Sequence, residues 1–172
     1  MVQKGDFFMS KTTKKLVRAG LIAGIYVVLS LITFPVASGA IQFRVAEALT
    51  LLPLFFAEAI PALFVGCMLS NLITGCFLLD VILGSVVTLV ASVMTYFVGK
   101  VVKTSALRII FGGIFPVLLN AFLLPVIWIV AYGAIEYVYY LQVIFLLISQ
   151  SVSIYVIGTY VFFAIKTKLK KE

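Results

Sequence analysis

Apolar positions follow one another in long runs, separated by short polar or charged breaks. Five runs carry no charge, and each is about long enough for a tilted transmembrane helix of roughly 20 residues. A sixth apolar run, 45–60, is shorter and contains acidic residues. The pattern predicts six transmembrane helices, over about 16–35, 45–60, 62–79, 81–99, 107–131 and 139–165.

The composition supports this interpretation. Of the 172 residues, 64% are hydrophobic and only 11% are charged, which is far more apolar than an ordinary soluble domain. We therefore expect an all-α integral membrane protein whose residues 16–165 form a bundle of six transmembrane helices. Residues 1–15 and 166–172 are expected to be basic tails at the two ends of this domain.

Positive charge is concentrated between the apolar runs. Twelve of the 13 lysines and arginines fall within 4–18, 100–108 and 166–171. Cytoplasmic segments of membrane proteins carry such an excess of basic residues. We therefore expect a multi-pass protein of the cell membrane with both termini in the cytoplasm. On this interpretation the net charge of +7 orients the chain, and no nucleic acid partner is expected.

Polar residues collect toward the opposite, outer side of the predicted bundle. Acids, an arginine and amides are costly inside a membrane, where they usually face the bundle interior or a pathway. Two of these residues are asparagines placed deeper within predicted helices. The candidate ligand contacts are Arg44, Glu47, Asn71, Asp80, Asn120 and Glu136.

Each candidate also has a purely structural interpretation. Arg44 and Glu47 are three residues apart and can pair with each other at a helix start. Asp80 can cap a helix, and Glu136 can be a solvated loop acid. The two asparagines can form hydrogen bonds between helices. Glu58, in a turn expected on the cytoplasmic side, is expected to have only a structural role.

Two patterns concern helix faces. Gln142, Ser149 and Ser153 share one face of the last predicted helix, which indicates a polar stripe pointing inward. In the first helix, Ala19 with Ala23 and Gly20 with Gly24 form two pairs of small residues at the spacing that lets helices approach closely in lipid. Such pairs serve either packing within the bundle or docking of a partner.

Several common functional sites are missing from the sequence. There is no histidine, and Cys67 and Cys76 are nine residues apart on one predicted helix, so no metal or other cofactor is expected. There is no phosphate-binding loop of the Gly-x-x-x-x-Gly-Lys-Ser/Thr type, so the chain has no ATPase of its own. No catalytic motif was found, and we expect no enzyme activity.

The chain resembles the substrate-binding S components of energy-coupling factor (ECF) transporters, and most closely the queuosine-precursor transporter (QueT) family. The resemblance spans roughly residues 15–165. It rests on Phe43-Arg-Val-Ala-Glu-Ala-Leu-Thr-Leu-Leu-Pro53, on Asn71 followed by Asp80-Val-Ile-Leu-Gly-Ser85, and on Pro116 with Asn120.

The resemblance implies a six-helix module that captures its ligand outside the cell. The module would then associate with a transmembrane T component and two ABC ATPases, and Ala19-x-x-x-Ala23 resembles the motif that docks it there. The implied ligand is a deazaguanine precursor of queuosine, or queuine. Glu47 or Asp80 would accept hydrogen bonds from the guanine-like edge of the ligand. Asn71 and Asn120 would contact the rest of the ligand, and Arg44 would hold Glu47 in place.

Three other functions remain open from the sequence. An S component for another flat vitamin, such as riboflavin, thiamine or folate, would share the fold but not the ligand. A small intramembrane enzyme would rely on two carboxylates. A structural subunit would use its polar residues only to join helices.

Overall fold

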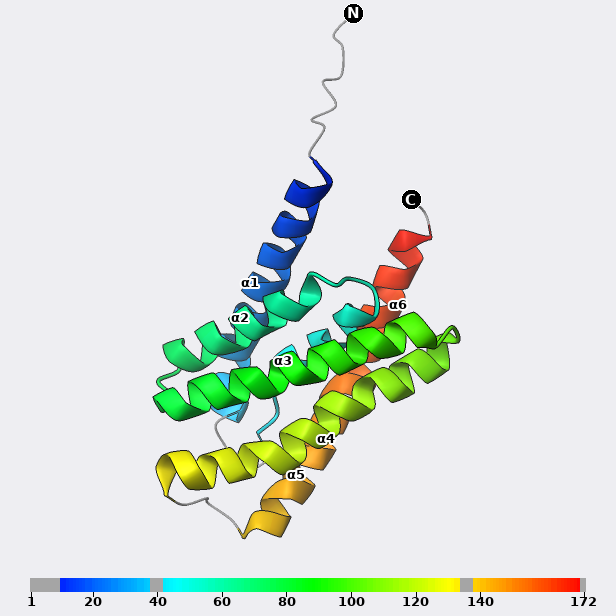
Figure 1. Cartoon of the computed structure of the whole chain (residues 1–172). Helices are drawn as coiled ribbons and strands as arrows, with labels where there is room; N and C mark the ends of the chain where they lie inside the picture. The colour runs from blue at the N-terminus through cyan, green and yellow to red at the C-terminus, as the bar shows by residue number, and fades with distance from the viewer. Residues whose placement is uncertain (1–9, 38–41, 134–137, 171–172) are drawn as a thin grey trace, which may run out of the picture.

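The computed structural model describes residues 10–37, 42–133 and 138–170, and these residues form helices and no strands. Helices are expected for apolar runs in lipid, where each backbone polar group must be satisfied within the protein. The elements are α1 (Lys11–Ala37), η1 (Val45–Leu54), α2 (Ala59–Ile73), α3 (Leu78–Val101), α4 (Ser105–Tyr132), α5 (Tyr139–Ser151), η2 (Val152–Ile157) and α6 (Gly158–Leu169) (Figure 1).

Within the described residues, four helices are long and apolar enough to cross a membrane. They are Lys11–Pro35 within α1, α3, α4, and a last helix over Tyr139–Leu169 that joins α5, η2 and α6. The two shorter apolar helices are η1 and α2. The all-helical fold class is thus confirmed, and the six predicted segments have their counterparts.

The second and third predicted segments differ from the structure in extent. The segment predicted as a helix over 45–60 is a 3₁₀ helix that ends at Leu54. Such helices rise about 2.0 Å per residue, so ten residues extend roughly as far as a longer α-helix would. The third segment, predicted to reach residue 79, ends at Ile73, because the chain turns at Gly75 with a φ of 77°.

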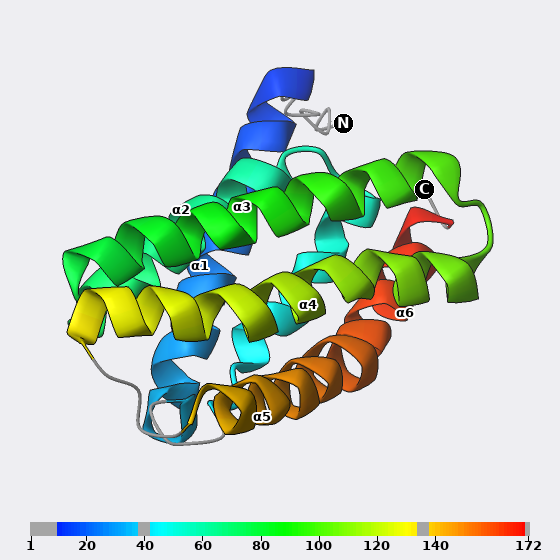
Figure 2. The ribbon, with the colours of Figure 1, turned by 60° about the horizontal axis from the view of Figure 1, so that its bottom comes forward.

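The 3₁₀ helix η1 lies at the centre of the molecule. Every residue from Ala46 to Leu54 is buried. It contacts α1, α2, α3, α4, α6 and η2, and Figure 2 shows it behind α4, between α3 and the last helix. Packing from all sides therefore determines its conformation, and local helix propensity does not.

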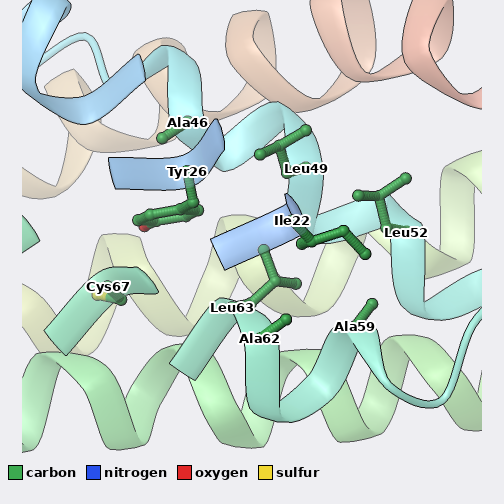
Figure 3. Close-up of a cluster of buried hydrophobic side chains, with 9 residues drawn as sticks. All are labelled: Ile22, Tyr26, Ala46, Leu49, Leu52, Ala59, Ala62, Leu63 and Cys67. Atoms are coloured by element: carbon green, nitrogen blue, oxygen red, sulfur yellow. The ribbon is translucent and has the colours of Figure 1, made fainter. Parts of the chain in front are cut away.

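A hydrophobic cluster joins η1 to the first two α-helices. Its buried residues are Ile22, Tyr26, Ala46, Leu49, Leu52, Ala59, Ala62, Leu63 and Cys67 (Figure 3). Ala19 and Ala23 pack against this cluster. Gly20 and Gly24 are exposed, and a Cβ at either would meet nothing within 4 Å. The alanine pair thus contributes to packing within the bundle, and the glycine pair lies on the open face of α1.

Basic residues from each of the three predicted clusters meet at one end of the bundle. Figure 1 shows the start of α1 and the end of α6 at the same end. Arg18 forms an ion pair with Glu58 at 2.8 Å, and Lys166 donates to Ser105 at the start of α4. Arg108 donates to the carbonyl oxygens of Leu54 and Gly99 at 2.8 and 2.7 Å. The side of the membrane that this end faces stays a prediction.

Gly99 lets α3 approach the end of η1. A Cβ at this position would lie 2.7 Å from the carbonyl oxygen of Leu54 and 2.9 Å from its Cα, so the two backbones would have to separate. We predict that Gly99→Ala destabilises the protein by about 1–3 kcal/mol, the usual cost of overpacking. Thermal unfolding of the purified protein in detergent measures this loss.

Gly20→Ala is the matched control, because its new Cβ meets nothing within 4 Å. Alanine favours a helix over glycine by about 1 kcal/mol, so this variant should unfold at the same temperature or higher. Equal unfolding temperatures for Gly99→Ala and the wild type would contradict the close packing.

Candidate functional site

Glu47 carries its carboxylate into the centre of the bundle, where only 1% of the residue is exposed. Oε1 accepts a hydrogen bond from the Tyr26 hydroxyl at 2.8 Å. Oε2 accepts one from Nδ2 of Asn120 at 3.3 Å. A buried carboxylate needs such donors to replace water. The fold therefore joins α1, η1 and α4 through one side chain.

The contacts of Glu47 continue toward the last helix. Nδ2 of Asn120 also lies 3.4 Å from Oε1 of Gln150, which is fully buried. Nε2 of Gln150 has no hydrogen-bond partner in the described part of the chain. The resulting network, Tyr26, Glu47, Asn120 and Gln150, is called here the central network. Its unused amide donors are available to a polar group.

Arg44 contacts a different candidate from the one expected. Its Nη2 donates to Oδ1 of Asn71 at 3.0 Å, and the described residues contain no ion pair between Arg44 and Glu47. The expectation that Arg44 holds Glu47 is therefore wrong. Arg44 precedes η1 with extended backbone, so the side-chain geometry of residues three apart on a helix does not apply.

The charges of both Glu47 and Asp80 nevertheless act on Arg44. Its partner Asn71 is buried and lies with Nδ2 3.7 Å from the sulfur of Cys67. This is a weak acceptor for an amide donor. Asn71 therefore keeps capacity to donate to another group.

Asp80 lies in the first turn of α3 and is 7% exposed. Its Oδ2 accepts a hydrogen bond from the Tyr132 hydroxyl at 3.2 Å. The same hydroxyl accepts from the backbone N–H of Phe77 at 3.0 Å. Tyr132 thereby ties the end of α4 to the start of α3 and positions the Asp80 carboxylate.

Gly84 lies one helical turn after Asp80 in α3, at the point where the side chains of Asp80 and Asn71 approach each other. A Cβ at this glycine would be 3.4 Å from Oδ1 of Asp80, 3.6 Å from Nδ2 of Asn71 and 3.8 Å from Cδ2 of Leu124. The acid of α3 and the amide of α2 thus face the same small volume. The missing side chain leaves a methyl-sized space between them.

Folding thus brings five of the six predicted residues into two groups. In the first, Asn120 donates to Glu47. In the second, Arg44 donates to Asn71, and Asn71 and Asp80 both lie next to Gly84. Glu136 lies outside the described residues. The polar stripe of the last helix is confirmed as inward-facing, because Gln142, Ser149 and Ser153 are all buried.

Several polar residues of the interior were not among the predicted site residues. Tyr26 and Gln150 belong to the central network, but neither stands out in its apolar helix. On α3, Ser85, Thr88, Ser92 and Thr95 are all buried. Their spacings of three and four residues place them on one helix face, and that periodicity was the available signal.

The arrangement suits recognition of a small polar molecule. Two carboxylates offer acceptors, while the guanidinium and the amides offer donors, all within an apolar bundle. Hydrogen bonds to charged groups are among the strongest in proteins. The three charged groups, Arg44, Glu47 and Asp80, sum to a net charge of −1 when ionised, which favours a ligand carrying a positive charge.

Comparisons with known proteins give one result. The sequence model of the family described as QueT transporter matches residues 16–167. No curated protein and no solved structure matches the chain. The family match covers every helix of the structure apart from the first turns of α1 and the last residues of α6. The chain therefore belongs to the QueT transporter family.

Proposed function

We propose that this transporter protein is the substrate-binding S component of an ECF-type importer and that its ligand is a queuosine precursor. The ligand would be a deazaguanine base or queuine. The observation that carries the proposal is the Glu47 carboxylate, 1% exposed and held by donors from two other helices. An acid inside a membrane is costly, and such residues usually serve a function rather than helix packing alone.

The chemistry of a deazaguanine matches the polar groups around Glu47 and Asp80. The guanine-like edge presents adjacent N–H donors, which one carboxylate accepts in pairs. Each oxygen of Glu47 has one protein donor, so lone pairs remain for the ligand. The amides of Asn71 and Asn120 would pair with the carbonyl and ring nitrogens, and the second acid would hold a protonated aminomethyl group.

In this proposal all six helical segments form one membrane domain. The end that carries Asp80 and Tyr132 faces outward, and the basic end with both termini faces the cytoplasm. A T component would dock on α1 and connect the chain to two ABC ATPases. The exposed pair Gly20 and Gly24 supports a docking surface on this helix, next to the inward-facing Ala19 and Ala23.

Calorimetric titration of the purified protein tests the ligand. We predict tight binding of aminomethyl-deazaguanine, cyano-deazaguanine or queuine, and binding of guanine at least about tenfold weaker, since loss of one good polar contact costs about 1.4 kcal/mol or more. Riboflavin, thiamine and folate should not compete. Competition by one of these vitamins, or no binding of any deazaguanine, would remove the ligand assignment.

Glu47→Gln locates the site in the same titration. The new amide can still pair with Tyr26, whose hydroxyl can accept, and with Asn120 through its oxygen, so the fold should persist. Affinity should fall by about tenfold or more, because a charge-assisted bond is lost. Glu58→Gln is the control, since Glu58 pairs with Arg18 at the other end. Equal affinity in both variants would exclude Glu47 from the site.

Gly84→Ala tests whether the ligand occupies the space between Asp80 and Asn71. The new methyl group would meet its neighbours at ordinary contact distances of 3.4–3.8 Å, so folding should be unaffected. It would fill the space that a ligand needs there, and affinity should fall by about tenfold, as for overpacking. Gly20→Ala serves as control. Unchanged affinity would place the ligand elsewhere.

Docking on α1 is tested by Gly24→Leu. The bulky side chain would project from the exposed face and keep a partner helix at a distance. We expect loss of co-purification with the T component and unchanged ligand binding. Val90→Leu, at an exposed position of α3, is the control. Complex formation by Gly24→Leu at the wild-type level would exclude this face.

A further inference from the structure

A hollow of about 130 Å³ lies at the basic end of the bundle, between α1 and α6. It is lined by Arg18, Phe56, Ile165, Lys168 and Leu169. These residues come from the first helix, the turn after η1, and the last helix. The hollow is therefore at the opposite end of the bundle from the Asp80 and Tyr132 contacts, and it belongs to no part of the proposed ligand site.

The hollow combines two cations with an apolar wall. Arg18 is fixed by its ion pair with Glu58 at 2.8 Å and by its position over the Phe56 ring, 4.1 Å from the centroid. A guanidinium carries five N–H donors, so most remain available beside Glu58. Among the described residues, the side-chain ammonium of Lys168 has no hydrogen-bond partner, in contrast to that of Lys166, which donates to Ser105.

The charged side chains around the hollow sum to one net positive charge, which one anion would balance. Arg18 and Glu58 compensate each other, and Lys168 adds one positive charge. Phe56, Ile165 and Leu169 provide apolar surface next to these cations. Leu169 is 42% exposed, and Leu16 near the start of α1 is 72% exposed, so both helices present apolar side chains to the membrane at this level.

We propose that this hollow binds the headgroup of an anionic phospholipid. The phosphate lies between Arg18 and Lys168, and the acyl chains run along Ile165, Leu169 and Phe56. Basic pockets between transmembrane helices bind anionic headgroups in this way. A free phosphate ion would contact only the cations, whereas a phospholipid would contact the cations with its phosphate and the apolar wall with its acyl chains. The bound lipid joins the first and last helices of the chain.

Native mass spectrometry of the full-length protein, released from detergent, tests the proposal with phosphatidylglycerol as the probe. We expect retained phosphatidylglycerol adducts and a raised unfolding temperature, with little of either for phosphatidylcholine, which has no net charge. Lys168→Glu should weaken phosphatidylglycerol binding by about fivefold or more, as expected for loss of one basic contact at a membrane surface.

Lys170→Glu is the matched control, because Lys170 is exposed on the same helix end but does not line the hollow. It should bind phosphatidylglycerol as the wild type does. Lys168→Gln repeats the test without a new negative charge, should the reversal disturb folding. Equal binding by the Lys168 and Lys170 variants would overturn the proposal. So would equal retention of phosphatidylcholine, or an equal stabilisation by inorganic phosphate alone.

Discussion

Glu47 must find its hydrogen-bond donors within the protein, because the helix that carries it is buried on every side. Tyr26 supplies one donor from α1, and Asn120 supplies another from α4. Gln150 extends the contacts to the last helix. A buried charge left without partners would cost several kcal/mol, so these polar residues in otherwise apolar helices are mutually dependent. These contacts connect η1 to three of the helices that pack around it.

The two ends of the bundle carry different polar groups. At one end, Arg44 donates to Asn71, and Asp80 accepts from Tyr132. At the other, basic side chains bind backbone carbonyls and Glu58 and close the ends of the helices. One end thus carries the groups that we propose bind the ligand. The other is rich in basic residues, on which the predicted orientation and the proposed lipid site both depend.

The sequence predicted those features that depend on periodicity and charge: the helical segments, the gathering of basic residues, and Asn71 and Asn120 as interior polar groups. It placed Glu47 at the outer surface, whereas the structure buries it in the bundle. It did not predict the 3₁₀ form of η1, because packing from six neighbouring elements determines that conformation. It also assigned Arg44 the wrong partner, since its backbone is extended and not helical. Tyr26 and Gln150 were missed because their significance comes only from residues distant in sequence.

The central claim is that a deazaguanine is held by the buried acids, and an experimental structure of the protein with aminomethyl-deazaguanine bound tests it most directly. The account predicts the guanine-like edge within about 2.7–3.2 Å of the carboxylate of Glu47 or Asp80, the distance of a normal hydrogen bond. A ligand bound elsewhere, with both carboxylates still contacting only protein groups, would contradict it.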